Sequence, residues 1–115
     1  MGQWVKGKSG DTFGPTGPYL VTKDEIPDIN NLNLNLEVNG KKMQSGNTKN
    51  MIFNINFIVS YLSNFMSLQP GDLITTGTPA GVGMGMKPQV FLKSGDNIKL
   101  SIDFLGEQNS KVVVK

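Results

Sequence analysis

The stretch from Leu32 to Val38 constrains the fold more than any other part of the sequence. Leucine or valine at every second position alternates with a polar residue, in the order Leu32, Asn33, Leu34, Asn35, Leu36, Glu37, Val38. This period of two predicts a β-strand with one buried face. Asn39-Gly40 follows at once and suits a type I′ turn, in which both central residues take a positive φ. We therefore expect residues 41–44 to pair back as a hairpin.

A single amphipathic helix is predicted over about residues 48–66. Its apolar residues recur at spacings of three and four, at Met51, Ile52, Ile55, Ile58, Val59, Leu62, Phe65 and Met66. This spacing places them on one helix face. Asn47, Thr48 or Asn50 could cap the first turn, and Pro70-Gly71 requires the helix to end before it.

The remaining elements are expected to be strands. Short apolar or β-branched runs, separated by turn residues, occur at Leu73–Thr76, Val90–Leu92, Ile98–Ile102 and Val112–Val114. Residues 5–20 contain too much glycine and proline for a helix, so Lys8 is expected on a strand or loop. One helix among several strands predicts a mostly β, α+β fold, and we expect a single domain spanning residues 1–115.

Composition narrows the class of function. Eleven basic and nine acidic residues give a net charge of +2, and because the lysines are scattered we expect neither nucleic-acid nor membrane partners. The chain has no cysteine, which excludes disulfides and thiolate zinc sites. No run approaches the roughly 18 apolar residues of a membrane helix, and Met1-Gly2-Gln3-Trp4 does not resemble a signal peptide. These features favour a cytoplasmic protein.

Three short patterns have a familiar form without the expected context. Gly2 and Gly7-Lys8-Ser9 match a phosphate-binding loop by letter, but Asp11–Pro15 cannot supply the helix that such a loop precedes. Gly81–Gly85 lacks the βαβ unit of a dinucleotide site. The acidic group at 24–28 is interrupted by Ile26-Pro27 and is interpreted as a solvated turn. We assign nucleotide binding and a metal site to none of them.

Two other segments carry plausible chemistry. Lys8 could stabilise an enolate or carboxylate oxygen in a closed site, although most lysines are only solvated. Thr76-Gly77-Thr78 combines hydroxyl groups with a bare backbone N–H at the predicted end of a strand. This combination could bind a carboxylate or oxo group, although by itself it is also an ordinary turn.

These segments belong to a series of motifs that are ordered along nearly the whole chain. The series is Gly7-Lys8-Ser9, Asp11-Thr12-Phe13, Gly14-Pro15, Leu36-Glu37-Val38-Asn39-Gly40, Gln44, Gly46-Asn47-Thr48, Met51-Ile52-Phe53, Pro70-Gly71-Asp72-Leu73-Ile74, Thr76-Gly77-Thr78-Pro79, Gly81-Val82-Gly83 and Leu105-Gly106. In order and spacing it resembles the C-terminal portion of the fumarylacetoacetate hydrolase family.

The resemblance implies a mixed β-roll, usually a homodimer, that hydrolyses, isomerises or decarboxylates small 2-oxo or 1,3-diketo acids with Mg²⁺ or Mn²⁺. It implies that Lys8 is the catalytic lysine that stabilises developing negative charge, and that Gly77 and Thr78 bind substrate. The family's metal ligands, two glutamates and an aspartate, and its catalytic histidine would lie upstream of this chain. Because those ligands would lie upstream, we expect this chain to bind no metal alone, and because it contains no histidine we expect it not to hydrolyse acylpyruvates alone.

Two departures leave alternatives open. The expected upstream half is absent, and Gly10 stands where relatives often have phenylalanine, which predicts a looser wall around Lys8. One alternative is therefore a non-catalytic or degenerate β-roll domain that serves dimerisation or binds a partner carrying the missing half. Exposed apolar surface is expected where that half would pack. The identity of the oxo acid and the type of reaction remain open at this stage.

Overall fold

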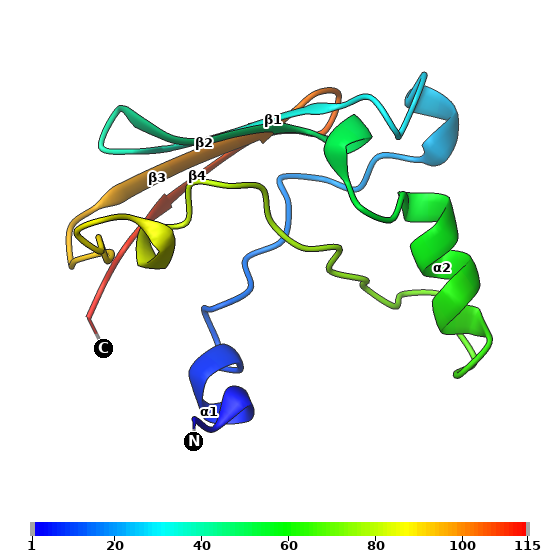
Figure 1. Ribbon diagram of the computed structural model, residues 1–115, viewed down its shortest axis with the longest axis horizontal. Helices are drawn as coiled ribbons and strands as arrows, with labels where there is room; N and C mark the ends of the chain where they lie inside the picture. The colour runs from blue at the N-terminus through cyan, green and yellow to red at the C-terminus, as the bar shows by residue number, and fades with distance from the viewer. Residues whose placement is uncertain (1, 115) are drawn as a thin grey trace.

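The computed structural model describes residues 2–114 and has a small, mostly sheet, α+β architecture (Figure 1). Its elements in chain order are α1 (Trp4–Lys8), the 3-10 helix η1 (Lys23–Glu25), β1 (Asn33–Val38), β2 (Lys41–Asn47), the 3-10 helix η2 (Thr48–Asn50), α2 (Ile55–Ser63), the 3-10 helix η3 (Gly83–Gly85), β3 (Asn97–Ile102) and β4 (Gly106–Lys111). The predicted α+β class is confirmed.

The four strands form one sheet in the order β2-β1-β3-β4, and every pairing is antiparallel. The predicted hairpin is present, with Val38 paired to Lys41. Asn39 and Gly40 connect its strands with φ of 52° and 75°, as a type I′ turn requires. β2 and β4 are therefore the two edges of the sheet.

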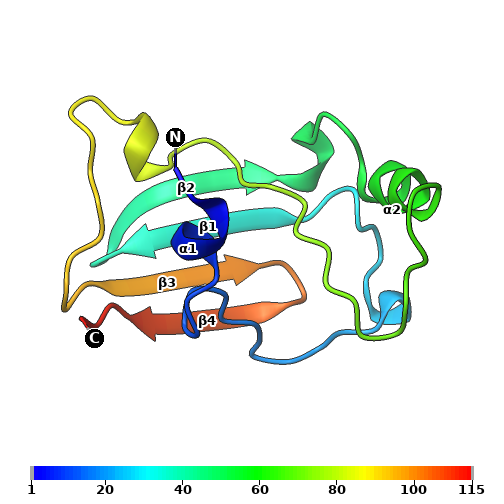
Figure 2. The same cartoon turned by 90° about the horizontal axis from the view of Figure 1, so that it is seen from below.

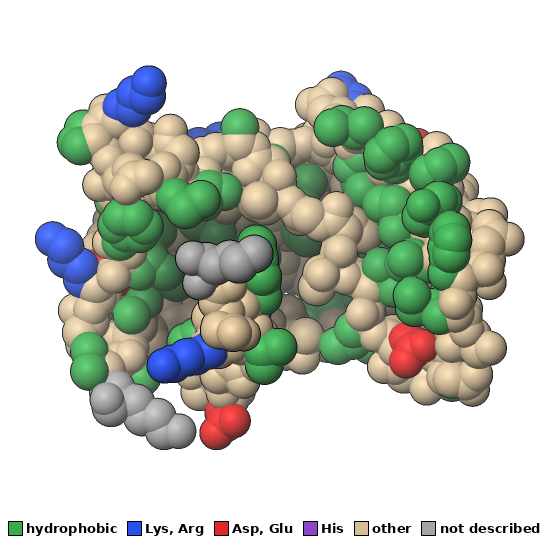
Figure 3. Space-filling model, turned by 60° about the horizontal axis from the view of Figure 1, so that its bottom comes forward, with side chains coloured by type: hydrophobic (Ala, Val, Ile, Leu, Met, Phe, Trp, Pro, Cys, Tyr) green, Lys and Arg blue, Asp and Glu red, His purple; other side chains and the backbone are tan. Residues whose placement is uncertain are grey.

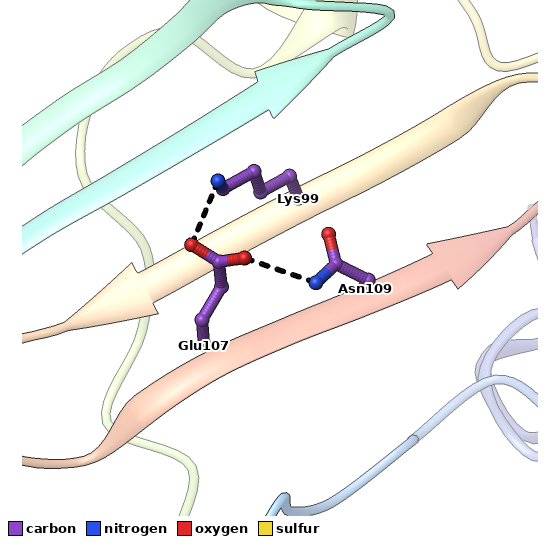
Figure 4. Close-up of polar contacts among 3 residues, drawn as sticks. All are labelled: Lys99, Glu107 and Asn109. Atoms are coloured by element: carbon purple, nitrogen blue, oxygen red, sulfur yellow. Dashed lines mark hydrogen bonds and ion pairs between the residues drawn. The ribbon is translucent and has the colours of Figure 1, made fainter.

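The two faces of the sheet differ in what covers them. Figure 1 shows the rest of the chain on one side of the sheet, and Gln44, which pairs with Leu36, contacts a loop on that side. The other face carries charged residues. Lys99 Nζ lies 2.8 Å from Glu107 Oε2, and Asn109 Nδ2 donates to Glu107 Oε1 at 3.0 Å (Figure 4). The alternation of the strands thus separates an apolar face from a polar one.

Little of the apolar surface is fully covered. Among residues 2–114, Leu32 is the only buried hydrophobic side chain, with 5% exposed. The accessible surface is 9540 Å², against roughly 6,200 Å² for a compact monomer of this mass. The radius of gyration is 15.7 Å, against about 13 Å for a compact domain of this length. Figure 3 shows hydrophobic side chains exposed along α2 and within the hollow beside it.

The predicted long helix over 48–66 is wrong. Residues 48–50 form η2, and α2 spans only Ile55–Ser63. The side chain of Asn47 accepts from Lys49 N and caps η2, whereas Asn54 Oδ1 accepts from Phe57 N at 2.8 Å and begins α2. The apolar spacing continued across both segments, but a second N-cap divides them, because Asn54 takes an extended conformation there.

The prediction that Lys8 lies on a strand or loop is also wrong. Lys8 is the last residue of α1, which is closed by bonds from Gly7 N to Gln3 O and from Ser9 N to Val5 O. The prolines that argued against a helix begin at Pro15. A single glycine within five residues lowers helix stability without preventing one turn.

Three predicted strands are not formed. Leu73–Thr76 and Val90–Leu92 run without sheet pairing, and β4 ends at Lys111, before the predicted strand at 112–114. The strand that does pair with β3 is the polar segment Gly106–Lys111. A turn over residues 103–105 brings it back onto β3, so connectivity selected the partner here instead of β-propensity.

No helix within residues 2–114 is long and apolar enough to cross a membrane.

Candidate functional site

The Thr76-Gly77-Thr78 segment lines a pocket of about 630 Å³. It was predicted at the end of a strand, but it lies in an extended, unpaired segment that runs beside β2 toward η3 (Figure 2). Gly77 has a φ of 110°, a conformation that favours glycine. The opposite walls come from β1, the end of β2, η2 and α2. The lining residues outside the 76–78 segment are Leu34, Ser45, Gly46, Asn47, Thr48, Asn50, Met51, Ile52, Phe53, Ile58, Pro79 and Ala80.

The lining combines threonine, serine and asparagine residues with Met51, Ile52 and Phe53. The Ser45 hydroxyl donates to Asn35 Oδ1, and the Asn47 amide donates to the side-chain oxygens of Asn31 and Asn33. None of the described lining residues is charged. The pocket therefore offers uncharged hydrogen-bonding groups beside an apolar wall.

The wall that carries Thr78 is held against the edge strand β2. Gln44 Nε2 donates to Thr78 Oγ1 and to Pro79 O, each at 2.8 Å. Two glycines allow the close approach: a Cβ on Gly46 would lie 2.7 Å from Pro79 Cβ, and a Cβ on Gly81 would lie 2.0 Å from Met43 O. The loop and the strand are therefore in contact over several residues, and Thr78 is fixed beside the pocket.

Lys8 lies apart from this pocket. Its side chain is exposed on α1, and it is not among the described residues that line the 630 Å³ space. The segment after α1 instead reaches the other edge of the sheet, where Gln108 Nε2 donates to Pro15 O at 3.3 Å and Gly17 O at 3.4 Å. Of the predicted site residues, Gly77 and Thr78 line the pocket and Lys8 does not.

The space beside Gly10 is occupied by an aromatic ring, while the looser wall around Lys8 stays a prediction. A Cβ on Gly10 would lie 3.0 Å from the Phe13 ring. An aromatic residue three positions along the chain therefore already occupies this space. A larger side chain at Gly10 would have to displace that ring.

The acidic side chains do not form a metal site. Within residues 2–114, no three acidic, histidine or cysteine side chains gather closely enough to hold an ion. Asp28 Oδ1 instead accepts from Asn30 N at 2.9 Å. A hydrogen bond from the Thr22 side chain, with a smaller contribution from the backbone N–H of Asp24, lowers the pKa of Asp24. The side chains of residues 2–114 therefore offer no ligand set for the divalent metal that the motifs imply.

The other groups with shifted pKa values lie on the sheet, outside the pocket. Bonds from Lys93 N and the Asn39 side chain lower the pKa of Asp96. The hydrogen-bonded pair of Lys99 and Glu107 raises the pKa of Lys99 and lowers that of Glu107. Lys99 and Glu107 keep 52% and 42% of their side chains exposed, and Asp96 is half-buried, so their shifts indicate local structure rather than a catalytic site.

Several residues of the site were not predicted. Gln44, Gly46 and Gly81 were given no role in a site, and Met51 and Ile52 were assigned to the apolar face of the predicted helix instead of to a pocket. A signal existed in the spacing of Gln44 and Gly46, because both follow the predicted hairpin turn on the strand that becomes an edge. The local sequence around Gln44 does not indicate which distant loop covers that edge.

One protein-family model matches nearly the full length of this chain. The family model described as fumarylacetoacetate (FAA) hydrolase C-terminal matches residues 1–113. The chain belongs to the fumarylacetoacetate hydrolase family. The motifs that suggested this resemblance therefore identified the family correctly.

Members of the family are much longer than this chain. A protein of Burkholderia ambifaria is 62% identical over 108 residues, which are 93% of this chain and 38% of that protein. The chain thus spans about two-fifths of the length of the curated relatives it matches.

Solved structures of the family include both hydrolases and isomerases. A fumarylacetoacetate hydrolase from Exiguobacterium antarcticum matches with a TM-score of 0.92 and 44% identity over 96% of this chain and 39% of that one. A 2-hydroxyhepta-2,4-diene-1,7-dioate isomerase from Mycobacterium marinum gives 0.83 and 41% over 96% and 40%. A maleylpyruvate hydrolase from Sphingobium sp. SYK-6, in complex with manganese(II) and pyruvate, gives 0.82 and 40% over 90% and 36%.

Proposed function

We propose that this chain supplies the substrate-binding wall of a metal-dependent enzyme that hydrolyses, isomerises or decarboxylates small 2-oxo or 1,3-diketo acids. The observation that carries the proposal is the pocket of about 630 Å³, which is lined by Gly77 and Thr78 in a chain of this family. Its neutral donors and apolar wall suit the carboxylate or oxo end and the carbon chain of such an acid. A manganese and pyruvate complex of a related hydrolase supports the choice of ligand.

In this proposal the residues of the chain have separate roles. The Thr78 hydroxyl and the backbone N–H groups beside Gly77 bind a substrate oxygen and orient the acid. Lys8 stabilises negative charge that develops on the oxo group. Because Lys8 lies outside the pocket of this chain, it reaches the substrate only in a completed site. A bound Mg²⁺ or Mn²⁺ would polarise the oxo-enolate.

The completed site requires more protein than residues 1–115. We infer that the four-stranded sheet is part of a larger mixed β-roll and that metal ligands come from residues outside this chain. The relatives' greater length supports this inference, as does the accessible surface of 9540 Å², which greatly exceeds that of a compact monomer. Association as a homodimer, or with a segment that supplies the rest of the roll, would cover that surface. The absence of cysteine fits a cytoplasmic location.

A titration of pyruvate into the isotopically labelled chain, followed by NMR, tests the substrate class. Amide shifts confined to residues 46–53 and 76–80 are expected, with a weaker response to lactate, which lacks the oxo group. Thr78→Val is the matched variant because it keeps the shape of the side chain and removes the hydroxyl. Shifts spread over the whole surface, or an equal response of that variant, would contradict the proposed site.

Calorimetric titration of manganese separates a half site from a complete one. No tight binding is expected of the 115-residue chain, because its acidic side chains within residues 2–114 form no cluster. We also expect no manganese-dependent hydrolysis of acylpyruvates by the chain alone, since it has no histidine to serve as the base. Heat from one tight site, or measurable turnover, would show that this chain carries a complete centre.

A non-catalytic or degenerate domain that serves dimerisation or partner binding is the second candidate. The exposed apolar surface along α2 favours it, since a surface of this kind marks an association site whether or not catalysis occurs. Phe57 and Tyr61 on α2, with Phe53 before it and Phe65 after it, form a row of rings with successive centroids 4.9, 6.0 and 4.9 Å apart. A protein that associates in sedimentation analysis but shows no pyruvate shifts would support this candidate.

A further inference from the structure

Four residues form a row straight across the sheet. The register pairs Gln44 with Leu36, Leu36 with Leu100, and Leu100 with Gln108. Directly paired residues of adjacent strands point to the same face. The row therefore has two half-buried leucines in its centre and a glutamine on each edge strand. Each glutamine binds a different distant segment, Gln44 at residues 78–79 and Gln108 at residues 15–17.

A bulge in β2 places Gln44 on this face. Glu37 pairs with Lys42 and Leu36 pairs with Gln44, so Met43 is an extra residue between two paired positions. In a regular strand Lys42 and Gln44 would lie on the same face, because side chains alternate. The extra residue turns Gln44 to the apolar face while Lys42 stays on the face of Glu37. Bulges often redirect a side chain beside a functional site.

The contacts of Gln44 determine how the Thr78 hydroxyl can be used. Both amide hydrogens of Gln44 are engaged, one by Thr78 Oγ1 and one by Pro79 O, at 2.8 Å each. A hydroxyl has one hydrogen to donate and two lone pairs to accept. Since Gln44 occupies a lone pair, the Thr78 proton remains available, and its contact with Pro79 O is long at 3.4 Å. A substrate oxygen in the pocket would offer a better acceptor.

We propose that Gln44 is a positioning residue that acts through Thr78. Its amide donates a hydrogen bond to the Thr78 hydroxyl oxygen, so that the hydroxyl proton is directed to a carboxylate or oxo oxygen in the pocket. The close contacts of Gly46 with Pro79 and of Gly81 with Met43 keep the loop at the distance that this bond requires. This inference rests on the proposed function for the identity of the ligand, but the geometry of Gln44 and Thr78 can be tested without a ligand.

The experiment uses the full 115-residue chain and four variants. Gln44→Leu removes both donors, and Gln44→Glu keeps the shape but accepts where glutamine donates. Gln108→Leu and Gln108→Glu are matched controls, because Gln108 lies in the same row and, within residues 2–114, bonds to Pro15 and Gly17 and not to Thr78. The measurements are the Thr78 side-chain rotamer, from three-bond couplings, and the dissociation constant for pyruvate.

Each variant has its own expected result. Gln44→Leu should average the Thr78 rotamer and weaken pyruvate binding about tenfold, the factor that corresponds to about 1.4 kcal/mol. Gln44→Glu should weaken binding at least about tenfold, because its carboxylate takes the Thr78 proton and repels Pro79 O, to which the glutamine amide donates. Charge repulsion between the new carboxylate and pyruvate contributes to this loss of affinity. Repeating the titration near 1 M salt, where the screening length is roughly 3 Å, reduces that contribution. The two Gln108 variants should change neither quantity by more than about twofold.

A double-mutant cycle decides whether Gln44 acts through Thr78. In the Thr78→Val background, Gln44→Leu should lower pyruvate affinity no further. An unchanged Thr78 rotamer in Gln44→Leu, or additive losses in the cycle, would overturn the role of Gln44. If the unaltered chain does not bind pyruvate, the proposed substrate class fails, while the rotamer measurements still decide whether Gln44 holds Thr78.

Discussion

The two edges of the sheet hold their segments with different strength. At β2, Gln44 makes two bonds of 2.8 Å to the loop at residues 78–79, and Gly46 and Gly81 leave no room for a side chain. At β4, Gln108 makes bonds of 3.3 and 3.4 Å to residues 15–17, and Lys8 lies seven residues before the nearer of them. The chain therefore organises the wall with Thr78 by itself and leaves Lys8 unpositioned. Under the proposed function, the part of the site that contains Thr78 is preorganised within this chain and the part that contains Lys8 is not.

The largest effect is expected from filling the space between β2 and the loop. Gly81→Ala would place a Cβ against Met43 O at a φ of 107°, and should destabilise the fold or detach the loop at a cost of about 2 to 4 kcal/mol. Gly71→Ala is the matched control, because Gly71 has a φ of 97° but open space around it. It should cost only about 1 kcal/mol. Urea unfolding measures both, and equal losses would mean that the contact with β2 is unimportant.

A second prediction compares the two proposed site residues in pyruvate binding. Thr78→Val should weaken binding by the isolated chain about tenfold, because a hydrogen bond to a charged oxygen is lost. Lys8→Met should change it less than about twofold, since Lys8 does not line the pocket. NMR titration measures both constants, with unfolding curves to verify that each variant folds. A loss with Lys8→Met as large as that with Thr78→Val would break the comparison between the two edges.

A smaller effect is expected from loosening the β4 edge. Gln108→Leu should cost less than about 1 kcal/mol, because its two bonds are long and partly exposed. Amide exchange should rise near Tyr19, whose hydroxyl packs against Gly106, and should stay unchanged over residues 76–81. Faster exchange in that loop would mean that the two edges are coupled through the leucines between them.

The smallest effect concerns pH. Lys99 lowers the folded pKa of Glu107 below its unfolded value of about 4.3, so this bond stabilises the fold above that pH. The stabilisation is lost as pH falls through the folded pKa. The pKa of Lys99 is raised, so its contribution is lost only as pH rises through a value above about 10.4. The contacts of Gln44 with Thr78 contain no titrating group. Amide protection factors, corrected for the intrinsic pH dependence of exchange, should therefore fall in β3 and β4 at pH 3 while the Thr78 side-chain rotamer stays unchanged, and Glu107→Gln should remove the pH-dependent loss.

The sequence predicted local geometry well wherever neighbouring residues decided it. The alternation over residues 32–38 and the Asn39-Gly40 turn specified β1, β2 and their connection, because period and positive φ are local properties. The apolar spacing indicated a helix near residues 51–66 but not its start, which the Asn54 cap decides. The ordered motifs identified the family, together with Gly77 and Thr78 as candidate ligand-binding residues.

Contacts between segments distant in the sequence decided the other features of the fold and the site. Leu73–Thr76 has strand propensity but lies outside the sheet, whereas the polar Gly106–Lys111 segment pairs, because the turn before it returns it to β3. The bulge at Met43 turns Gln44 toward Thr78, 34 residues away in the chain. Sequence by itself determined the hairpin and the family, and it showed that residues 76–78 combine two hydroxyl groups with a glycine. Only the tertiary structure decided that Gln44 holds Thr78 and that Lys8 stands apart, because both depend on contacts between segments whose local sequences do not specify each other.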